Sequence, residues 1–249
     1  MAGLAKSTYY RTIKNLNKKD KYDEVKLAIQ KISGRYGYRR VTIQLHKEGF
    51  TINHKVVMKL MKRMGLTCKV RLKKYRSYKC QNGKIADNIL KRNFKAAKPN
   101  QKWATDITEF ALCGQKIYLS PILDMYNGEI ISYKISEKPV LKQVIDMVKD
   151  ALCNISCEDQ IILHSDQGWQ YQHKSYQKLL KENNIIQSMS RKGNCLDNAV
   201  MENFFGILKS ELFYLKKFKT VDIFIRKLEE YIDYYNNQRI KSKLKDLVL

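Results

Sequence analysis

The stretch "IILHSDQGWQY", residues 161–171, begins as an apolar strand and stops at a carboxylate. Its first three residues, 161–163, favour extended structure and burial, and the polar run 164–168 ends the strand. Asp166, within this run, has two interpretations. Aspartate and glycine are common turn residues, and carboxylate oxygens are also ligands that Mg²⁺ takes in proteins. The choice depends on whether other acids in the chain reach Asp166.

The pattern on both sides of this stretch predicts a mixed sheet covered by helices. Alternating or apolar runs bounded by turn residues predict strands over 101–112, 116–126, 128–136, 160–166 and 185–190. Apolar residues at helical spacing predict helices over 140–153, 174–184, 195–213 and 220–238. Three hairpin-joined strands beside two strands that helices connect give an α/β fold with five strands, in which the first and fourth are neighbours.

Two further acids are placed to meet Asp166. Asp106 lies in the middle of the first predicted strand, and Glu202 lies in the helix that follows the fifth. Three carboxylates close together repel one another strongly unless cations neutralise them. Mg²⁺ suits such oxygen ligands, and a pair of these ions can activate an attacking oxygen and stabilise a leaving one. The sequence therefore predicts catalytic, metal-binding acids at these three positions.

Other arrangements of reactive residues are also conceivable. Asp124 ends the second predicted strand and could replace Asp106 as a ligand. The consecutive residues His164, Ser165 and Asp166 cannot form a Ser-His-Asp triad, because neighbours in a strand alternate sides. A covalent tyrosine or serine nucleophile is a further alternative, but no single residue stands out among the 16 tyrosines.

The positive charge is concentrated in the first part of the chain. The 249 residues carry a net charge of +24, and 1–100 contain 27 basic but only 5 acidic side chains. Such a distribution indicates a polyanion partner, and double-stranded DNA is the leading one. An anionic membrane is disfavoured, because no segment combines a basic face with exposed bulky apolar residues.

Residues 1–66 are predicted to form a small all-α helix-turn-helix domain. Of its three short helices, the last, 51–65, has an apolar stripe with basic side chains off it. The expected DNA contacts there are Lys55, Lys59, Lys62 and Arg63. An ordinary three-helix bundle with solvated lysines is the alternative. Residues 67–100 are predicted to be a basic linker with aromatic residues available for base stacking, namely Tyr75, Tyr78 and Phe94.

Cysteine usage and the first residues indicate a cytoplasmic protein without a membrane segment. The six cysteines include no C-x-x-C pair, and "MAGLAKSTYYR" lacks the apolar core of a secretory leader. No apolar run approaches the roughly 20 residues that span a bilayer. A zinc site is disfavoured, because the spacing of its possible ligands is unusual. Those ligands would be His46, His54, Cys68 and Cys80.

Several longer motifs resemble those of one family. Between Asp106 and Asp166 lie 59 residues, and between Asp166 and Glu202 lie 35. With the stretches "KWATDITEF", "YLSPILDMYNGEIISY", "LHSDQGWQY", "MSRKGNCLDNAVMENFFGILKSEL" and "YIDYYNNQRIKSKL", this spacing resembles the DDE transposases and retroviral-type integrases. The similarity is greatest to the second reading frame of bacterial insertion sequences of the IS-three family. The earlier stretch "GRYGYRRVTIQLHKEGFTINHKVVMKLMKRMGL" resembles the helix-turn-helix segment of such proteins.

This resemblance implies an RNase H-like catalytic core over 101–249, ending in a long helix. It implies a transposase that cleaves and joins DNA strands at the element ends with two Mg²⁺ ions, for which Mn²⁺ is expected to substitute. A homo-oligomer on DNA is expected, working alone or with an upstream reading-frame product. Near the acids, Asp197 is expected to be an N-terminal cap or first-turn acid of its helix, and no further cofactor is implied. The expected DNA contacts there are Arg191, Lys192, Asn198 and Lys209.

Two other functions remain open from the sequence. An RNase H-like nuclease would use the same metals without joining strands, and a decayed element product would bind DNA as a catalytically silent repressor. The resemblance also implies a Ser-Pro-x-Glu-Tyr-like segment after "KSKLKDL", where this sequence reads "LKDLVL". We expect the shorter end to affect strand joining more than folding.

Overall fold

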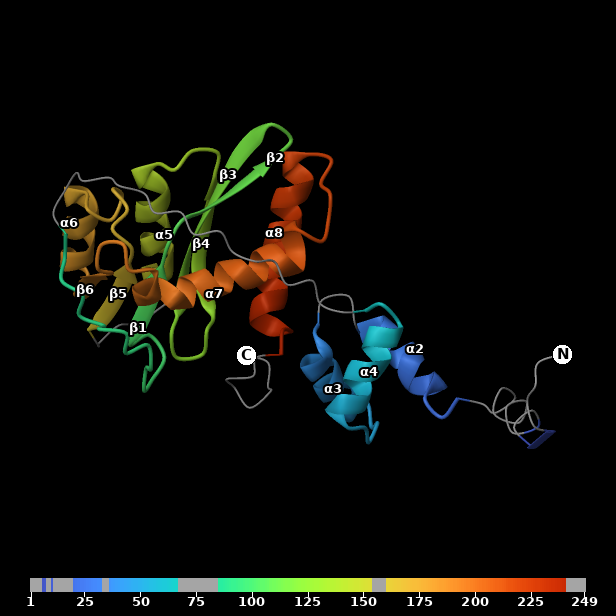
Figure 1. Ribbon diagram of the computed structural model, residues 1–249. Coiled ribbons are helices and arrows are strands. Elements are labelled where there is room, and N and C mark those ends of the chain that lie inside the picture. The colour runs from blue at the N-terminus through green and yellow to red at the C-terminus, as the bar shows by residue number, and fades with distance from the viewer. Residues whose placement is uncertain are drawn as a thin grey trace. The chain divides into compact units, whose positions relative to one another are not determined.

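The computed structural model describes residues 6–7, 10, 20–32, 36–66, 85–153 and 160–240. The chain divides into two compact units, a helical unit of residues 1–70 and a core unit of residues 71–249 (Figure 1). Among the residues described, no helix has both the length and the apolar character to cross a membrane.

The described part of the helical unit contains three short helices around one apolar core. These are α2 (Asp23–Ile32), α3 (Tyr38–Lys47) and α4 (His54–Arg63). Ile29, Val41 and Val57 are fully buried in this core. The side chain of Asn53 accepts a hydrogen bond from the backbone N–H of Lys55 at 2.8 Å, which caps the start of α4. The three helices that the sequence predicts are therefore present.

The core unit is built on a mixed sheet. Its strands are β1 (Lys102–Thr105), β2 (Thr108–Leu112), β3 (Gln115–Asp124), β4 (Ile130–Ser136), β5 (Ile161–Ser165) and β6 (Ile185–Met189). β3 pairs antiparallel with β1, β2 and β4, whereas β5 lies parallel between β1 and β6. The prediction that the first strand neighbours the strand leading to Asp166 is confirmed.

The predicted strand 101–112 is interrupted at Asp106, so that six strands replace the five expected. The residue pairs of β1 and β2 follow one continuous register against β3, which places Asp106 opposite Pro121. The N–H of Met125 donates to the Lys102 carbonyl oxygen at 2.9 Å. In an antiparallel pair every second residue donates to the neighbouring strand, so Pro121 occupies one of the donor positions toward β1. Because the nitrogen of Pro121 carries no hydrogen, the ladder lacks a hydrogen bond at Asp106.

Helices cover both faces of the sheet (Figure 1). They are α5 (Leu141–Cys153) and α6 (Lys174–Glu182) on one face, and α7 (Ala199–Leu208) and α8 (Val221–Asn237) on the other. Trp103 packs with α5 and α6, whereas the next residue, Ala104, packs with α7 and α8. The alternation of β1 therefore assigns its side chains to the two faces. We call the face that α7 and α8 cover the α7 face.

The predicted helix 195–213 is divided into three parts. A 3₁₀ turn, η1 (Cys195–Asn198), precedes α7, and a π-helical turn, η2 (Lys209–Phe213), follows it. In η2, Glu211 accepts two hydrogen bonds from the buried guanidinium of Arg239, at 2.8 and 3.0 Å. The hydroxyl of Tyr231 donates a third, at 2.8 Å. These bonds hold η2 against the C-terminal part of α8.

Part of the predicted linker 67–100 packs on the core unit. Residues 67–84, which include the two tyrosines expected to stack on bases, lie outside the described residues. After them, Leu90 is buried in the apolar cluster of the α7 face, and Phe94 packs against the same cluster. Phe94 therefore contributes to apolar packing while it remains partly exposed, and base stacking by its ring stays a prediction. We call residues 85–92 the strap.

Candidate active site

The pairing of β1 with β5 brings two of the three predicted acids together. Ala104 of β1 lies beside His164 of β5 in a parallel register. Two residues further along each strand, the same register reaches Asp106 and Asp166. Side chains two residues apart in a strand lie on the same face. Asp106 therefore lies on the face of Ala104, the α7 face, and Asp166 lies on the same face through the pairing of β5 with β1. The two carboxylates therefore lie on one side of the sheet, at the carboxyl ends of adjacent strands.

Asp106 is held by two donors. Its Oδ1 accepts a hydrogen bond from the backbone N–H of Ile107 at 2.7 Å, and its Oδ2 accepts one from Asn198 Nδ2 at 3.1 Å. Burial raises the pKa of Asp106 well above its usual range, and the negative charges of Asp166 and Glu202 raise it further. The site therefore concentrates negative charge that a bound cation would neutralise.

Asp166 is held by the loop that follows β5. The N–H of Gly168 donates to Asp166 Oδ1 at 2.8 Å, while burial raises the pKa of this carboxyl. A Cβ on residue 168 would lie 2.9 Å from Asp166 Oδ1, 3.2 Å from Tyr171 Cδ2 and 3.3 Å from Gln170 Oε1. A side chain at this position would displace the carboxylate, so the hydrogen bond requires glycine.

Glu202 lies in the first turn of α7, near the two aspartates. Its charge is among the causes that raise the pKa of Asp106, so the two groups interact electrostatically. Within the described ranges, however, no group of three His, Cys, Asp or Glu side chains lies close enough to bind one metal ion. The structure thus places Asp106 and Asp166 together, with Glu202 near them but outside a closed ligand cluster.

Asp124, considered above as a substitute for Asp106, has a different environment. It pairs with Trp103 across the β1–β3 ladder, and directly opposed residues share a face, so its side chain lies away from the α7 face. Its carboxylate accepts hydrogen bonds from the N–H groups of Asn100 at 2.8 Å and Tyr126 at 2.9 Å. Asp124 therefore stabilises the turn after β3.

The oxygen atoms around Asp106 and Asp166 suit a divalent cation. Asn198 is almost fully buried, and its Oδ1 has no hydrogen-bond partner in the described structure. Two adjacent carboxylates and a buried amide oxygen are the kind of donor set that Mg²⁺ and Mn²⁺ accept. Burial raises the pKa of both aspartates, and a bound cation would offset this penalty on their charged forms. The residues present therefore fit the expected metal.

Tyr171 is a buried residue near the acids that the sequence could not distinguish from the other tyrosines. Burial raises the pKa of its hydroxyl well above the usual range, and the charges of Asp106 and Asp166 raise it further. The hydroxyl stays protonated at neutral pH and is a poor nucleophile. This environment disfavours a covalent tyrosine mechanism at Tyr171.

The basic residues expected to contact DNA from the helical unit are exposed. They are Lys55, Lys59, Lys62 and Arg63, all on α4. Arg63 also lines a shallow hollow with Asp20 and Asp23, so part of its charge is offset.

Of the possible zinc ligands, His46 contacts the carbonyl oxygen of Ile52 at 2.7 Å through Nε2, and both cysteines lie outside the described residues.

The basic residues expected to contact DNA near the acids have different surroundings. Lys192 is exposed in the loop before η1. The Lys209 ammonium lies 5.2 Å from the centroid of the Phe110 ring, and its positive charge opposes the rise in the pKa of Asp106. The side chain of Asn198 binds Asp106 instead of projecting to solvent. A DNA contact remains a prediction for each of these residues.

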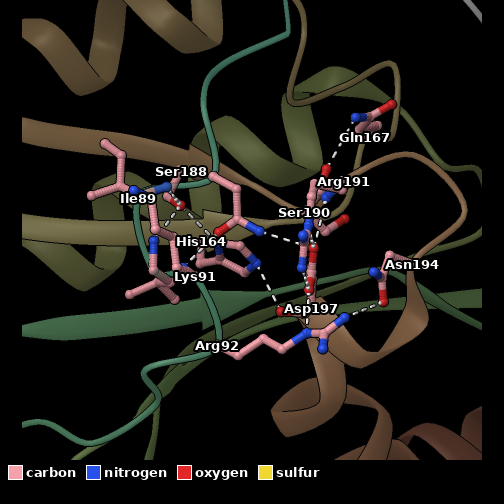
Figure 2. A network of polar contacts seen from close by, with 12 residues as sticks. Ile89, Lys91, Arg92, His164, Gln167, Ser188, Ser190, Arg191, Asn194 and Asp197 are labelled. Carbon is pink, nitrogen blue, oxygen red and sulfur yellow. Dashed lines mark hydrogen bonds and ion pairs between the residues drawn. The ribbon is translucent and has the colours of Figure 1, made fainter.

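Arg191 is bound to Asp197, a contact that the sequence did not indicate. Its Nε and Nη2 donate to the two carboxylate oxygens at 2.9 and 3.0 Å, and its backbone N–H donates at 3.1 Å (Figure 2). The expectation that Asp197 is an N-terminal cap or first-turn acid did not include this pair, because the sequence does not define the geometry of the loop and 3₁₀ turn that hold the two residues. Arg191 therefore has a structural role, whatever it contributes to DNA binding.

Three parts of the chain match family models. Residues 17–74 match an HTH-like domain, whereas residues 96–195 and residues 202–247 each match an integrase core domain. The chain is 52% identical over 250 residues to the putative transposase InsK for insertion sequence element IS150 of Escherichia coli strain K12, covering 99% of this chain and 88% of that protein. It is 34% identical over 217 residues to the transposase InsF for insertion sequence IS3A of the same strain, covering 86% and 75%.

The fold is similar to a solved structure. The cryoEM structure of the simian T-cell lymphotropic virus intasome in complex with PP2A regulatory subunit B56 gamma matches with a TM-score of 0.50 at 16% identity. The match covers 83% of this chain and 66% of that one. At this identity, the likeness concerns the fold alone.

Proposed function

The chain belongs to the insertion-sequence transposases that combine an HTH-like domain with an integrase core domain, and we propose that Asp106, Asp166 and Glu202 are its catalytic acids. Its function is the cleavage and transfer of DNA strands by an integrase-type mechanism. The observation that supports the assignment of the acids is the parallel register of β1 and β5, which places Asp106 beside Asp166 at the strand ends.

We propose that these acids hold two Mg²⁺ ions, with Mn²⁺ able to substitute. Asp106 and Asp166 would supply adjacent ligands, and Glu202 would complete the set from α7. When bound, the ions supply positive charge that activates the attacking oxygen and stabilises the leaving oxygen of an in-line displacement at phosphorus. The attacking oxygen is that of water in cleavage and that of the released DNA 3′-hydroxyl in joining.

The protein groups around the acids fix their positions before DNA arrives. Asn198 holds Oδ2 of Asp106, and the N–H of Gly168 holds Oδ1 of Asp166. Both aspartates are partly buried, which strengthens electrostatic interactions in the site. Tyr171 remains protonated beside them, which disfavours its hydroxyl as a covalent nucleophile.

We propose that the helical unit binds the element ends through the exposed basic face of α4. Lys55, Lys59 and Lys62 lie on that face. Basic side chains that contact phosphates bind DNA with a strong dependence on salt. In the core unit, Lys192 and Lys209 would contact the DNA near the reacting phosphate, and the active assembly is proposed to be a homo-oligomer on DNA.

A cleavage and joining assay tests this function. The purified chain is incubated with Mg²⁺ and duplexes that carry the ends of its own element, both intact and already cut at the 3′ ends. We expect cleavage of the intact ends and joining of the cut ends to a target duplex, with neither reaction in Asp106→Asn. Cleavage without joining of cut ends would indicate a nuclease. Normal joining by the variant would remove Asp106 from the site.

A further inference from the structure

The carboxylate of Asp197 is completely buried, and donors from three residues in two segments of the chain surround it. Arg191 supplies its Nε, Nη2 and backbone N–H, and Arg92 supplies its Nε at 2.9 Å (Figure 2). Asn88 supplies its Nδ2 at 2.9 Å. Desolvation makes a buried charge unfavourable unless it is paired and hydrogen-bonded. These five bonds join the strap and the loop before η1 at one residue.

The backbone of Asp197 is tied to β5 as well. Its carbonyl oxygen lies 2.9 Å from His164 Nε2, and His164 Nδ1 lies 2.9 Å from Ser188 Oγ. The hydroxyl oxygen of Ser188 accepts from Ile89 N–H at 3.0 Å, which leaves its own hydrogen for Nδ1. The ring proton is therefore assigned to Nε2, which donates to the carbonyl oxygen of Asp197. This chain connects the strap, β6, β5 and η1.

The residue that follows Asp197 holds a catalytic acid. Asn198 donates its amide to Asp106, and His164 lies two residues before Asp166. We propose that Asp197 is a positioning residue of the active site, which fixes η1 so that Asn198 can hold Asp106 in its reactive place. The expected effect on catalysis rests on the proposed function, whereas the expected positioning of Asn198 and Asp106 rests on the contacts alone.

A purely structural role for Asp197 makes a different prediction. Loss of a structural anchor lowers the melting temperature, and its effect adds to that of an independent change elsewhere. A positioning role through Asn198 instead makes the two residues dependent on each other. Once Asn198 no longer holds Asp106, changing Asp197 should cause little further loss of activity.

The test compares Asp197→Asn, Asn198→Ala and the double variant in the full chain. Asparagine keeps the size of Asp197 but removes its negative charge. It also presents an N–H₂ group, which cannot accept hydrogen bonds from the surrounding donors. We expect each single change to lower kcat 10- to 100-fold, the range usual for groups that orient metal ligands, with KM for DNA little changed. The double variant should lie within about threefold of the more affected single variant.

Calorimetric titration with Mn²⁺ alone provides a readout that needs no DNA. Each single variant should bind Mn²⁺ 10- to 100-fold more weakly than the wild type, again without further loss in the double variant. If no protein, including the wild type, cleaves element ends while this binding pattern holds, the proposed function fails and the positioning role stands. Wild-type Mn²⁺ affinity in a folded Asp197→Asn would overturn the inference.

Two more variants keep the test decisive. Arg92→Met removes only one of the five hydrogen bonds, so it serves if Asp197→Asn does not fold, and it should lower kcat and Mn²⁺ affinity severalfold.

Gln143→Met is the matched control, because its buried amide ties α5 to the carbonyl oxygens of Tyr118 and Lys134 at 2.9 Å each. It should lower the melting temperature but leave kcat and Mn²⁺ binding near wild type. Equal kinetic losses in this control, or additive losses in the double variant, would overturn the inference.

Discussion

Replacing Gly168 with alanine should damage catalysis far more than folding. The added Cβ would lie 2.9 Å from Asp166 Oδ1, a distance that real Cβ atoms do not tolerate. The carboxylate would have to move by about 0.5 Å to reach an ordinary contact, and it would lose its 2.8 Å hydrogen bond from the N–H of residue 168. Because a displacement of ~1 Å in a reacting group can cost about 100-fold, we expect kcat to fall roughly 10- to 100-fold.

The stability cost of this change follows from the same contacts. Losing a hydrogen bond to a charged carboxylate costs roughly 1.5–3 kcal/mol. Replacing glycine by alanine restricts the unfolded chain and returns about 0.4–1 kcal/mol where the backbone conformation permits alanine. The net loss of about 0.5–2.6 kcal/mol corresponds to a fall in melting temperature of roughly 1–10 °C for a domain of this size. Gly168→Ala should therefore remain folded at 25 °C.

Single-turnover cleavage of element ends, together with thermal melting, measures both effects. Gly206→Ala is the control, because a Cβ on this residue of α7 would meet no heavy atom within 4 Å. Alanine there should stabilise the helix by up to about 1 kcal/mol and leave the rate near wild type. If Gly168→Ala cleaves at the wild-type rate, the position of the Asp166 carboxylate does not limit catalysis and the reasoning is refuted.

Three further results are expected. Asp106→Asn, Asp166→Asn and Glu202→Gln should each abolish cleavage and joining while duplex binding stays near wild type in an electrophoretic shift assay, and a residue whose variant still joins strands would be excluded from the site. Lys59→Ala should reduce the slope of log affinity for duplex DNA against log salt by about 0.9, measured by fluorescence anisotropy, whereas an unchanged slope would mean that Lys59 contacts no phosphate. Hydrogen bonds from Arg191 and Arg92 hold the pKa of Asp197 well below its ordinary value of 3.8, so its stabilising effect is complete above that pH and is lost as the pH falls through the lower, folded value. The difference in melting temperature between wild type and Asp197→Asn should therefore be constant from about pH 8 to pH 5 and shrink below about pH 4, and a difference that already declines between pH 8 and pH 5 would contradict this assignment.

The sequence was most informative where the chemistry depends on strand order. Asp106 and Asp166 follow apolar runs, and a mixed sheet with these runs as neighbours brings the two acids together whatever the details of the loops. The interruption of the first strand was not predictable in the same way. It arises where Asp106 faces Pro121, and that pairing depends on a register that only the folded hairpin defines.

Charged residues were harder to interpret from the sequence. Arg191 lies in a basic, glycine-containing stretch, which favoured a DNA contact, but its guanidinium binds the buried Asp197. Arg92 and Asn88 belong to a segment whose composition indicates a linker, yet they bind the same carboxylate from about 100 residues away. Such pairings arise between segments far apart in the sequence, so local composition carries no trace of them.

The division of the chain into two units has a consequence during synthesis. The helical unit has its own apolar core, complete once Leu66 is made, whereas the core unit needs α8 and Arg239, close to the end of the described chain. At the usual 5–20 residues per second, the interval between these two points is on the order of 10 to 30 seconds. During that time a nascent chain carries a folded basic module without an assembled catalytic centre. DNA close to the translating ribosome is therefore the first DNA that each new molecule can contact.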